Sequence, residues 1–154
     1  MPTCYQLVGV PGSGKSTWIK NQDWAKDCSV ASTDMWVEME AERQGKTYSE
    51  IFDEYMPHAV RLMANHVELA RDKDMDIIWD QTSTTLASRR RKFNMLPKYR
   101  HIAVVFKTPE PEELARRLNS RPGKTIPDHV VKRMIEGYDI PTEDEGFTEI
   151  WYVG

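Results

Sequence analysis

The sequence has 154 residues, a length that suits one domain with a single buried core. Hydrophobic residues make up 40% of it and charged residues 29%, which argues against a disordered chain, and no apolar stretch approaches the roughly 20 residues of a membrane-spanning helix. The net charge of −3 argues against a broad, non-specific nucleic-acid binder but is compatible with a local basic channel.

Short apolar runs alternate with longer amphipathic segments along the chain, a pattern typical of a parallel sheet covered by helices. Strands are expected at residues 5–10, 29–32, 76–80, 102–106 and 149–153. Helices are expected at residues 15–22, 35–43, 57–73, 86–95, 111–119 and 128–137, with a further short helix starting near residue 47. We therefore predict an α/β fold and assign residues 1–154 to one domain.

Several helix ends carry recognisable signals. The run Thr47-Tyr48-Ser49-Glu50 has the spacing of a capping box, and Pro57 is expected to begin a separate long helix. Asp128 is expected to cap the helix that ends near residue 137. The acidic segment 141–146 is expected to be a solvated loop.

The clearest motif is a phosphate-binding loop between the first predicted strand and the helix that follows it. Residues 9–16, Gly-Val-Pro-Gly-Ser-Gly-Lys-Ser, match G-x-x-x-x-G-K-[ST] at every fixed position. Glycines let consecutive backbone N–H groups point into one hollow, and the helix adds the positive end of its dipole. Lys15 is expected to reach the β- and γ-phosphates of ATP, and the Ser16 hydroxyl to bind Mg²⁺. The residues expected to contact the nucleotide are Gly12, Ser13, Gly14, Lys15, Ser16 and Thr17.

The phosphate loop occurs in kinases and in NTP hydrolases alike, and two absences favour a kinase. No Asn-Lys-x-Asp element follows a later strand, so the motif by which GTPases usually select guanine is missing from the sequence. The chain is also too short for the core of a helicase or a ring ATPase. The interpretation that remains is a small phosphotransferase that uses ATP and Mg²⁺.

Two aspartates follow predicted strands and so belong at the same sheet edge as the phosphates. Asp34 is our candidate general base, which would orient an acceptor hydroxyl and take its proton; its alternative role is to cap the next helix. Asp80 ends an apolar strand, as a Walker-B-type acid does, and is expected to serve the Mg²⁺ site or to orient Ser16. Capping or turn formation is the alternative for Asp80.

A basic segment near residue 120 is predicted to form a lid over the nucleotide. Arg117 and Arg121 are four residues apart and so project from one helix face, and Pro122-Gly123-Lys124 must turn directly after them. Arg121 is expected to stabilise the transferring phosphoryl group, with Arg117 binding the nucleotide. The alternative is a solvated basic helix end. A second basic run, residues 89–92, either binds phosphates of a polymeric acceptor or forms a solvated helix face.

These motifs together resemble the phage-type polynucleotide 5′-kinase branch of the P-loop kinases. The resemblance rests on residues 9–18, on Asp34, on Ile-Ile-Trp-Asp-Gln-Thr (77–82) and on Arg-Leu-Asn-Ser-Arg-Pro-Gly-Lys-Thr-Ile-Pro (117–127). It implies a P-loop NTPase of the adenylate-kinase-like, three-layer type, with a five-stranded parallel sheet and an arginine-bearing lid. It also implies transfer of the γ-phosphate of ATP to the 5′-hydroxyl of DNA or RNA, catalysed by Lys15, Asp34, Asp80 and Arg121. The expected partners are thus a nucleoside triphosphate and the 5′ end of a single-stranded nucleic acid.

The sequence departs from that family on the acceptor side. The polynucleotide kinases carry an arginine three residues after the base, where this chain has Val37, and the aspartate that follows the base is here Met35. The phosphatase domain that often follows the kinase is not present in the sequence. A nucleoside-sized molecule or a modified base is therefore the alternative acceptor, and a non-catalytic NTP-binding module is a third hypothesis. The sequence begins without a recognisable signal peptide and has only two cysteines, so a cytoplasmic protein is expected.

Overall fold

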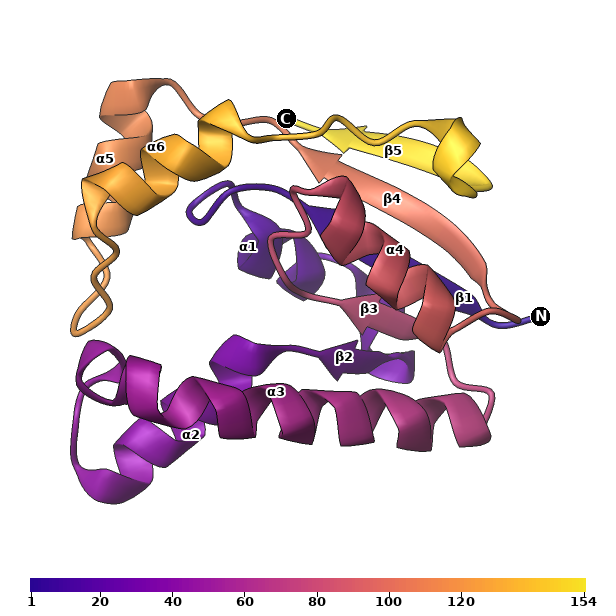
Figure 1. Ribbon diagram of the computed structural model, residues 1–154, viewed down its shortest axis with the longest axis horizontal. Helices are drawn as coiled ribbons and strands as arrows, with labels where there is room; N and C mark the ends of the chain where they lie inside the picture. The colour runs from indigo at the N-terminus through magenta and orange to yellow at the C-terminus, as the bar shows by residue number, and fades with distance from the viewer.

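The five predicted strands form one sheet, and every neighbouring pair of strands is parallel. In the computed structural model, which describes residues 1–154, they are β1 (Thr3–Val8), β2 (Ser29–Ala31), β3 (Ile77–Trp79), β4 (Arg100–Phe106) and β5 (Glu149–Val153) (Figure 1). Their order across the sheet is β2-β3-β1-β4-β5. The predicted α/β fold with five parallel strands is confirmed, and no strand end differs from the expected one by more than two residues.

Helices cover both faces of this sheet (Figure 1). The α-helices are α1 (Lys15–Lys20), α2 (Thr33–Gln44), α3 (Tyr48–Asp72), α4 (Leu86–Met95), α5 (Pro111–Asn119) and α6 (Asp128–Glu136). Two 3₁₀ helices that the sequence did not predict are η1 (Asp23–Asp27) and η2 (Glu143–Glu145). Because side chains alternate along a strand, Cys4 of β1 packs in one cluster with Met63 of α3, whereas Leu7 packs on the opposite face with Ala25 of η1. The result is a three-layer domain.

Helix α3 differs most from its prediction. It runs unbroken from Tyr48 to Asp72 with Pro57 inside it, so there is no separate helix that begins at Pro57. A proline inside a helix removes one backbone hydrogen bond and normally disfavours this arrangement. Here the helix buries one apolar stripe on both sides of the proline, which offsets that cost. The stripe consists of Ile51, Ala59, Met63, Val67 and Ala70.

The helix caps confirm one prediction and correct two. The capping box of α3 is present, because the Thr47 hydroxyl accepts from the Glu50 N–H and the Glu50 carboxylate accepts from the Thr47 N–H. Helix α2 is capped by Ser32, whose hydroxyl accepts from the Met35 N–H at 3.3 Å, so the alternative capping role for Asp34 is wrong. Asp128 lies in the first turn of α6 and makes no cap hydrogen bond, although its charge suits that helix end.

Two helices and the loop between them lie at the carboxyl edge of the sheet. Helices α5 and α6 stand there, and residues 120–127, which we call the lid, connect them and reach toward the turn between α2 and α3 (Figure 1). None of the helices combines the length and the apolar character that crossing a membrane would require.

Candidate active site

One cleft at the carboxyl edge of the sheet brings all the predicted site residues together. Its volume is about 1590 Å³, larger than the roughly 300–1,000 Å³ of a pocket for one small ligand. It therefore has room for a nucleotide and an acceptor side by side. The predicted residues that line it are Gly12, Ser13, Gly14, Lys15, Ser16, Thr17, Asp34, Asp80, Arg117 and Arg121.

The phosphate loop has the backbone that its glycines were expected to provide. Gly12 and Gly14 adopt φ angles of 83° and 104°, which side-chain-bearing residues rarely adopt. Gly9 is needed for a different reason, because a Cβ atom there would lie 2.5 Å from the Ser13 hydroxyl oxygen. The Gly9 N–H donates to the Thr82 carbonyl at 2.9 Å, which ties the loop to the segment after β3.

The Lys15 side chain points back onto the phosphate loop. Its ammonium group donates to the carbonyl oxygens of Gly9 at 2.7 Å and Val10 at 2.9 Å. Burial lowers the pKa of Lys15 to about 8, opposed in part by the nearby carboxylates of Asp80 and Asp34. Phosphate oxygens in the cleft would replace the two carbonyls as partners and favour the charged form.

Ser16 and Asp80 have the donor chemistry of a Mg²⁺ site. Asp80 lies just beyond β3, where its backbone N–H donates to the Ala31 carbonyl oxygen at 2.7 Å. Burial raises the pKa of the Asp80 carboxyl group, and the nearby charge of Lys15 opposes this rise. No cluster of three or more His, Cys, Asp or Glu side chains exists that could hold a metal alone. Mg²⁺ in phosphotransferases typically takes one or two protein oxygens and completes its shell with water and phosphate oxygens. The pair of residues fits that requirement.

Asp34, the candidate base, has both carboxylate oxygens engaged. The Tyr48 hydroxyl donates to Oδ1 at 2.5 Å, and the Lys124 ammonium group donates to Oδ2 at 3.2 Å. Lys124 also pairs with Glu38 at 3.0 Å. Half of the Asp34 side chain remains exposed to the cleft, so a further hydroxyl can still reach it.

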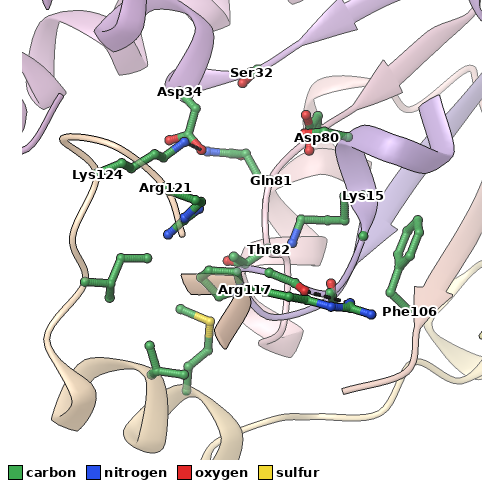
Figure 2. A pocket seen from close by; sticks show the side chains of 18 of the residues that line it. Lys15, Ser32, Asp34, Asp80, Gln81, Thr82, Phe106, Arg117, Arg121 and Lys124 are labelled. Atoms are coloured by element: carbon green, nitrogen blue, oxygen red, sulfur yellow. Dashed lines mark hydrogen bonds and ion pairs between the residues drawn. The ribbon is translucent and has the colours of Figure 1, made fainter. Parts of the chain in front are cut away.

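The lid places Arg121 and Lys124 on the cleft side of the loop (Figure 2). Nε and Nη2 of Arg121 are buried and have no hydrogen-bond partner in the protein. Buried donors are normally paired, so these two are suited to an anionic ligand. Arg117 is held differently, because its Nη1 donates to the Gly12 carbonyl at 3.0 Å and its Nε to Glu113 at 2.9 Å. Arg117 thus braces the phosphate loop from α5.

The basic run at residues 89–92 is a solvated helix face at two of its four positions, and the other two side chains are buried. The Arg89 side chain is fully buried, and it forms a bidentate pair with Glu145, with Nε to Oε1 at 2.7 Å. Its Nη1 donates to the Ser83 carbonyl at 2.9 Å. Lys92 is also buried, over the Trp79 ring, and only Arg90 and Arg91 face solvent. The prediction that segment 141–146 is solvated is accordingly wrong for Glu145, because its side chain is the buried partner of Arg89.

Sequence reasoning missed Tyr48 and underrated Lys124. The sequence signal for Tyr48 was its place directly after the Thr47 cap, which fixes where the side chain of the first helical residue points. Nothing local to Tyr48 or Lys124 revealed that both contact Asp34, because the three residues are 14 to 90 positions apart. Such a contact depends on the tertiary fold.

A phosphate loop after β1 and carboxylates after β2 and β3, on a five-stranded parallel sheet, define a P-loop domain of the kinase type. Within that class, the chain belongs to the family described as AAA domain, whose model matches residues 5–141.

Solved structures with the same fold include several kinases. A provisionally named kinase of Chloroflexus aurantiacus has a TM-score of 0.72 at 15% identity, covering 99% of this chain and 84% of that one. A chain of the Pnkp1/Rnl/Hen1 RNA repair complex has a TM-score of 0.65 at 23% identity, covering 88% of this chain but 43% of that one. Shikimate kinase of Acinetobacter baumannii has a TM-score of 0.57 at 16% identity, covering 100% and 84%. At these sequence identities the similarities show a shared fold and nothing about the acceptor.

Proposed function

We propose that this protein is an ATP-dependent kinase that transfers the γ-phosphate to a hydroxyl group, with Asp34 as its general base. The observation that carries the proposal is the convergence of Lys15, Asp34 and the unpartnered guanidinium group of Arg121 on one cleft. Each has a role in phosphoryl transfer that it can perform from where it lies.

In this reaction the acceptor oxygen attacks the γ-phosphorus, and the bond from that phosphorus to the β–γ bridging oxygen breaks. The hydroxyl proton passes to Asp34, and ADP leaves. Lys15 and the loop N–H groups hold the β- and γ-phosphates, and Arg121 donates to the oxygens of the transferring group. Ser16 and Asp80 would hold Mg²⁺, which supplies neutralisation of the phosphate charge.

For the acceptor, we propose the 5′-hydroxyl end of a single-stranded polynucleotide. Support comes from the resemblance of residues 9–18, 77–82 and 117–127 to the polynucleotide 5′-kinases. The similarity in fold to a chain of an RNA repair complex adds to it. The size of the cleft suits an extended acceptor that enters beside the nucleotide.

A second acceptor class is favoured by the residues around Asp34. Val37 stands where the polynucleotide kinases have an arginine. Its side chain is fully buried in a cluster with Ala41 and Ile51 and does not line the cleft. The cleft is lined there by Glu38 and Asp53, whose charges disfavour a nearby phosphate. A neutral hydroxyl compound of nucleoside size, or a hydroxyl on a modified base, would avoid that repulsion.

Labelled ATP decides between the two acceptors. With γ-labelled ATP and Mg²⁺, label at the 5′ end of a 5′-hydroxyl oligonucleotide supports the polynucleotide acceptor. Label on a nucleoside, or inside a strand that carries modified bases, supports the second class. Tight ATP binding with no transfer to any hydroxyl would contradict the kinase proposal.

The role of Asp34 is tested by Asp34→Asn, which keeps the shape of the side chain but cannot take a proton. We expect the transfer rate to fall about 10²–10⁴-fold, the usual contribution of general-base catalysis. Asp144→Asn, in an exposed acidic segment remote from the cleft, is the matched control and should be as active as the wild type. Full activity in Asp34→Asn would exclude Asp34 as the base.

A further inference from the structure

Asp34 is held by two segments that are distant from it in the sequence. Tyr48, the first residue of α3, donates its hydroxyl hydrogen to Oδ1 at 2.5 Å. Lys124, from the lid, donates to Oδ2 at 3.2 Å. All three side chains line the cleft.

The Tyr48 hydroxyl is fixed as a donor to Asp34. Burial raises the pKa of Tyr48, and the hydrogen bond to the Asp34 carboxylate raises it further, so the phenol keeps its proton throughout the physiological range. Its ring is held by the start of α3, whose capping box sets the direction of the first turn, and it packs against Phe52 at a centroid distance of 5.4 Å. A short hydrogen bond from a fixed donor orients a carboxylate.

The same residues also receive the lid. The Lys124 ammonium group lies 4.5 Å from the centre of the Tyr48 ring, an arrangement in which the ring face attracts a cation. Next to Tyr48, the Ser49 N–H donates to the Gly123 carbonyl at 3.0 Å, and the Thr125 N–H donates to the Ser49 hydroxyl at 2.8 Å. The first residues of α3 therefore contact both the proposed base and the lid.

We propose that Tyr48 is the positioning residue of the base and that it couples the orientation of Asp34 to closure of the lid. The inference rests on the proposed role of Asp34. A carboxylate has about four lone-pair sites, so the bonds to Tyr48 and Lys124 leave room for an acceptor hydroxyl. Closure that brings Arg121 to the phosphates also brings Lys124 onto Asp34 and the Tyr48 ring. Donor and acceptor are thereby aligned in one movement.

The test begins with Tyr48→Phe, which removes the hydroxyl and keeps the ring that Lys124 contacts. The chemical shift of the Asp34 carboxyl carbon is measured by NMR at neutral pH in protein labelled at aspartate, with the signal identified by its loss in Asp34→Asn. We expect this signal to move in Tyr48→Phe, because Oδ1 of Asp34 loses the short hydrogen bond from the Tyr48 hydroxyl. This measurement needs no acceptor, so it is decisive even if no phosphoryl transfer is found.

Tyr99→Phe is the matched control, because the Tyr99 hydroxyl also makes one short hydrogen bond, to the Met75 carbonyl at 2.7 Å, away from the cleft. The Asp34 signal should not move in that variant. An unmoved Asp34 signal in Tyr48→Phe would overturn the inference.

Kinetics give a second, independent measurement of the same role. With an active acceptor, Tyr48→Phe should lower kcat about tenfold, while KM for ATP stays the same. An unchanged kcat, or a KM for ATP that rises in step with the fall in kcat as in a general structural defect, would overturn the inference. Absence of transfer in the wild type, together with a moved Asp34 signal, would instead contradict the proposed function and leave the positioning role of Tyr48 supported.

Discussion

The two halves of the cleft are built in opposite ways. The donor side is centred on the phosphate loop, a consecutive run of residues after β1, which is supported by contacts such as Gly9 to Thr82 and Arg117 to Gly12. The acceptor side joins Asp34 of α2, Tyr48 of α3 and Lys124 of the lid, all from separate segments and partly exposed. Chemistry common to P-loop kinases thus occupies the half that is built from neighbouring residues, and the proposed acceptor half is built from side chains of separate segments.

Arg121→Ala should produce the largest effect, because it removes the lid cation whose buried nitrogen atoms have no partner in the protein and are suited to the transferring phosphoryl group. We expect kcat to fall about 10³–10⁵-fold, the range found when a catalytic arginine is lost in phosphoryl transfer. ATP binding, measured separately, should weaken far less, since Lys15 and the loop remain. Arg116→Ala is the control, because Arg116 is exposed on α5 and pairs only with Glu113. An equal fall in kcat in both variants would show that Arg121 has no specific role in the reaction.

Arg89→Met tests whether the donor side depends on the buried pair behind it. Arg89 holds the Ser83 carbonyl next to Thr82, whose own carbonyl holds Gly9. Removal of Arg89 leaves Glu145 buried without its partner, so unfolding in urea should show a loss of about 3–5 kcal/mol. Arg90→Met, at the exposed neighbouring position, should change the free energy of unfolding by less than about 0.5 kcal/mol.

A second substitution separates the charge of Glu145 from its packing. Adding Glu145→Gln to Arg89→Met should restore part of the stability, because the remaining side chain is then neutral. If Arg89→Met alone is as stable as the wild type, the buried pair does not support the loop.

The same contrast explains what the sequence could predict. The fold followed from alternating apolar runs, and the phosphate loop from a motif whose residues are adjacent in the chain, so both needed only local information. Placing Asp34 and Asp80 at one edge needed one further rule, that parallel strands end on the same side of a sheet. The pairs Tyr48–Asp34 and Arg89–Glu145 join residues 14 and 56 positions apart. A basic run on a helix does not show which of its members turns inward, and a proline does not show whether the buried stripe around it is continuous.

The smallest effect we predict is the uptake of protons when ATP binds, and it tests the donor side of the cleft alone. Because burial lowers the pKa of Lys15 to about 8, about half of the free protein carries a neutral Lys15 at pH 8. Phosphates next to the amine favour its charged form, so ATP binding at pH 8 should take up about half a proton, and less as the pH falls toward 7. Titration calorimetry in two buffers of different ionisation enthalpy measures this uptake directly. Lys15→Arg should abolish it, because a guanidinium group stays charged at this pH. Equal binding enthalpies in both buffers for the wild type would show that Lys15 is already charged in the free protein, and that its contacts with Gly9 and Val10 stabilise the ammonium form as well as the phosphates do.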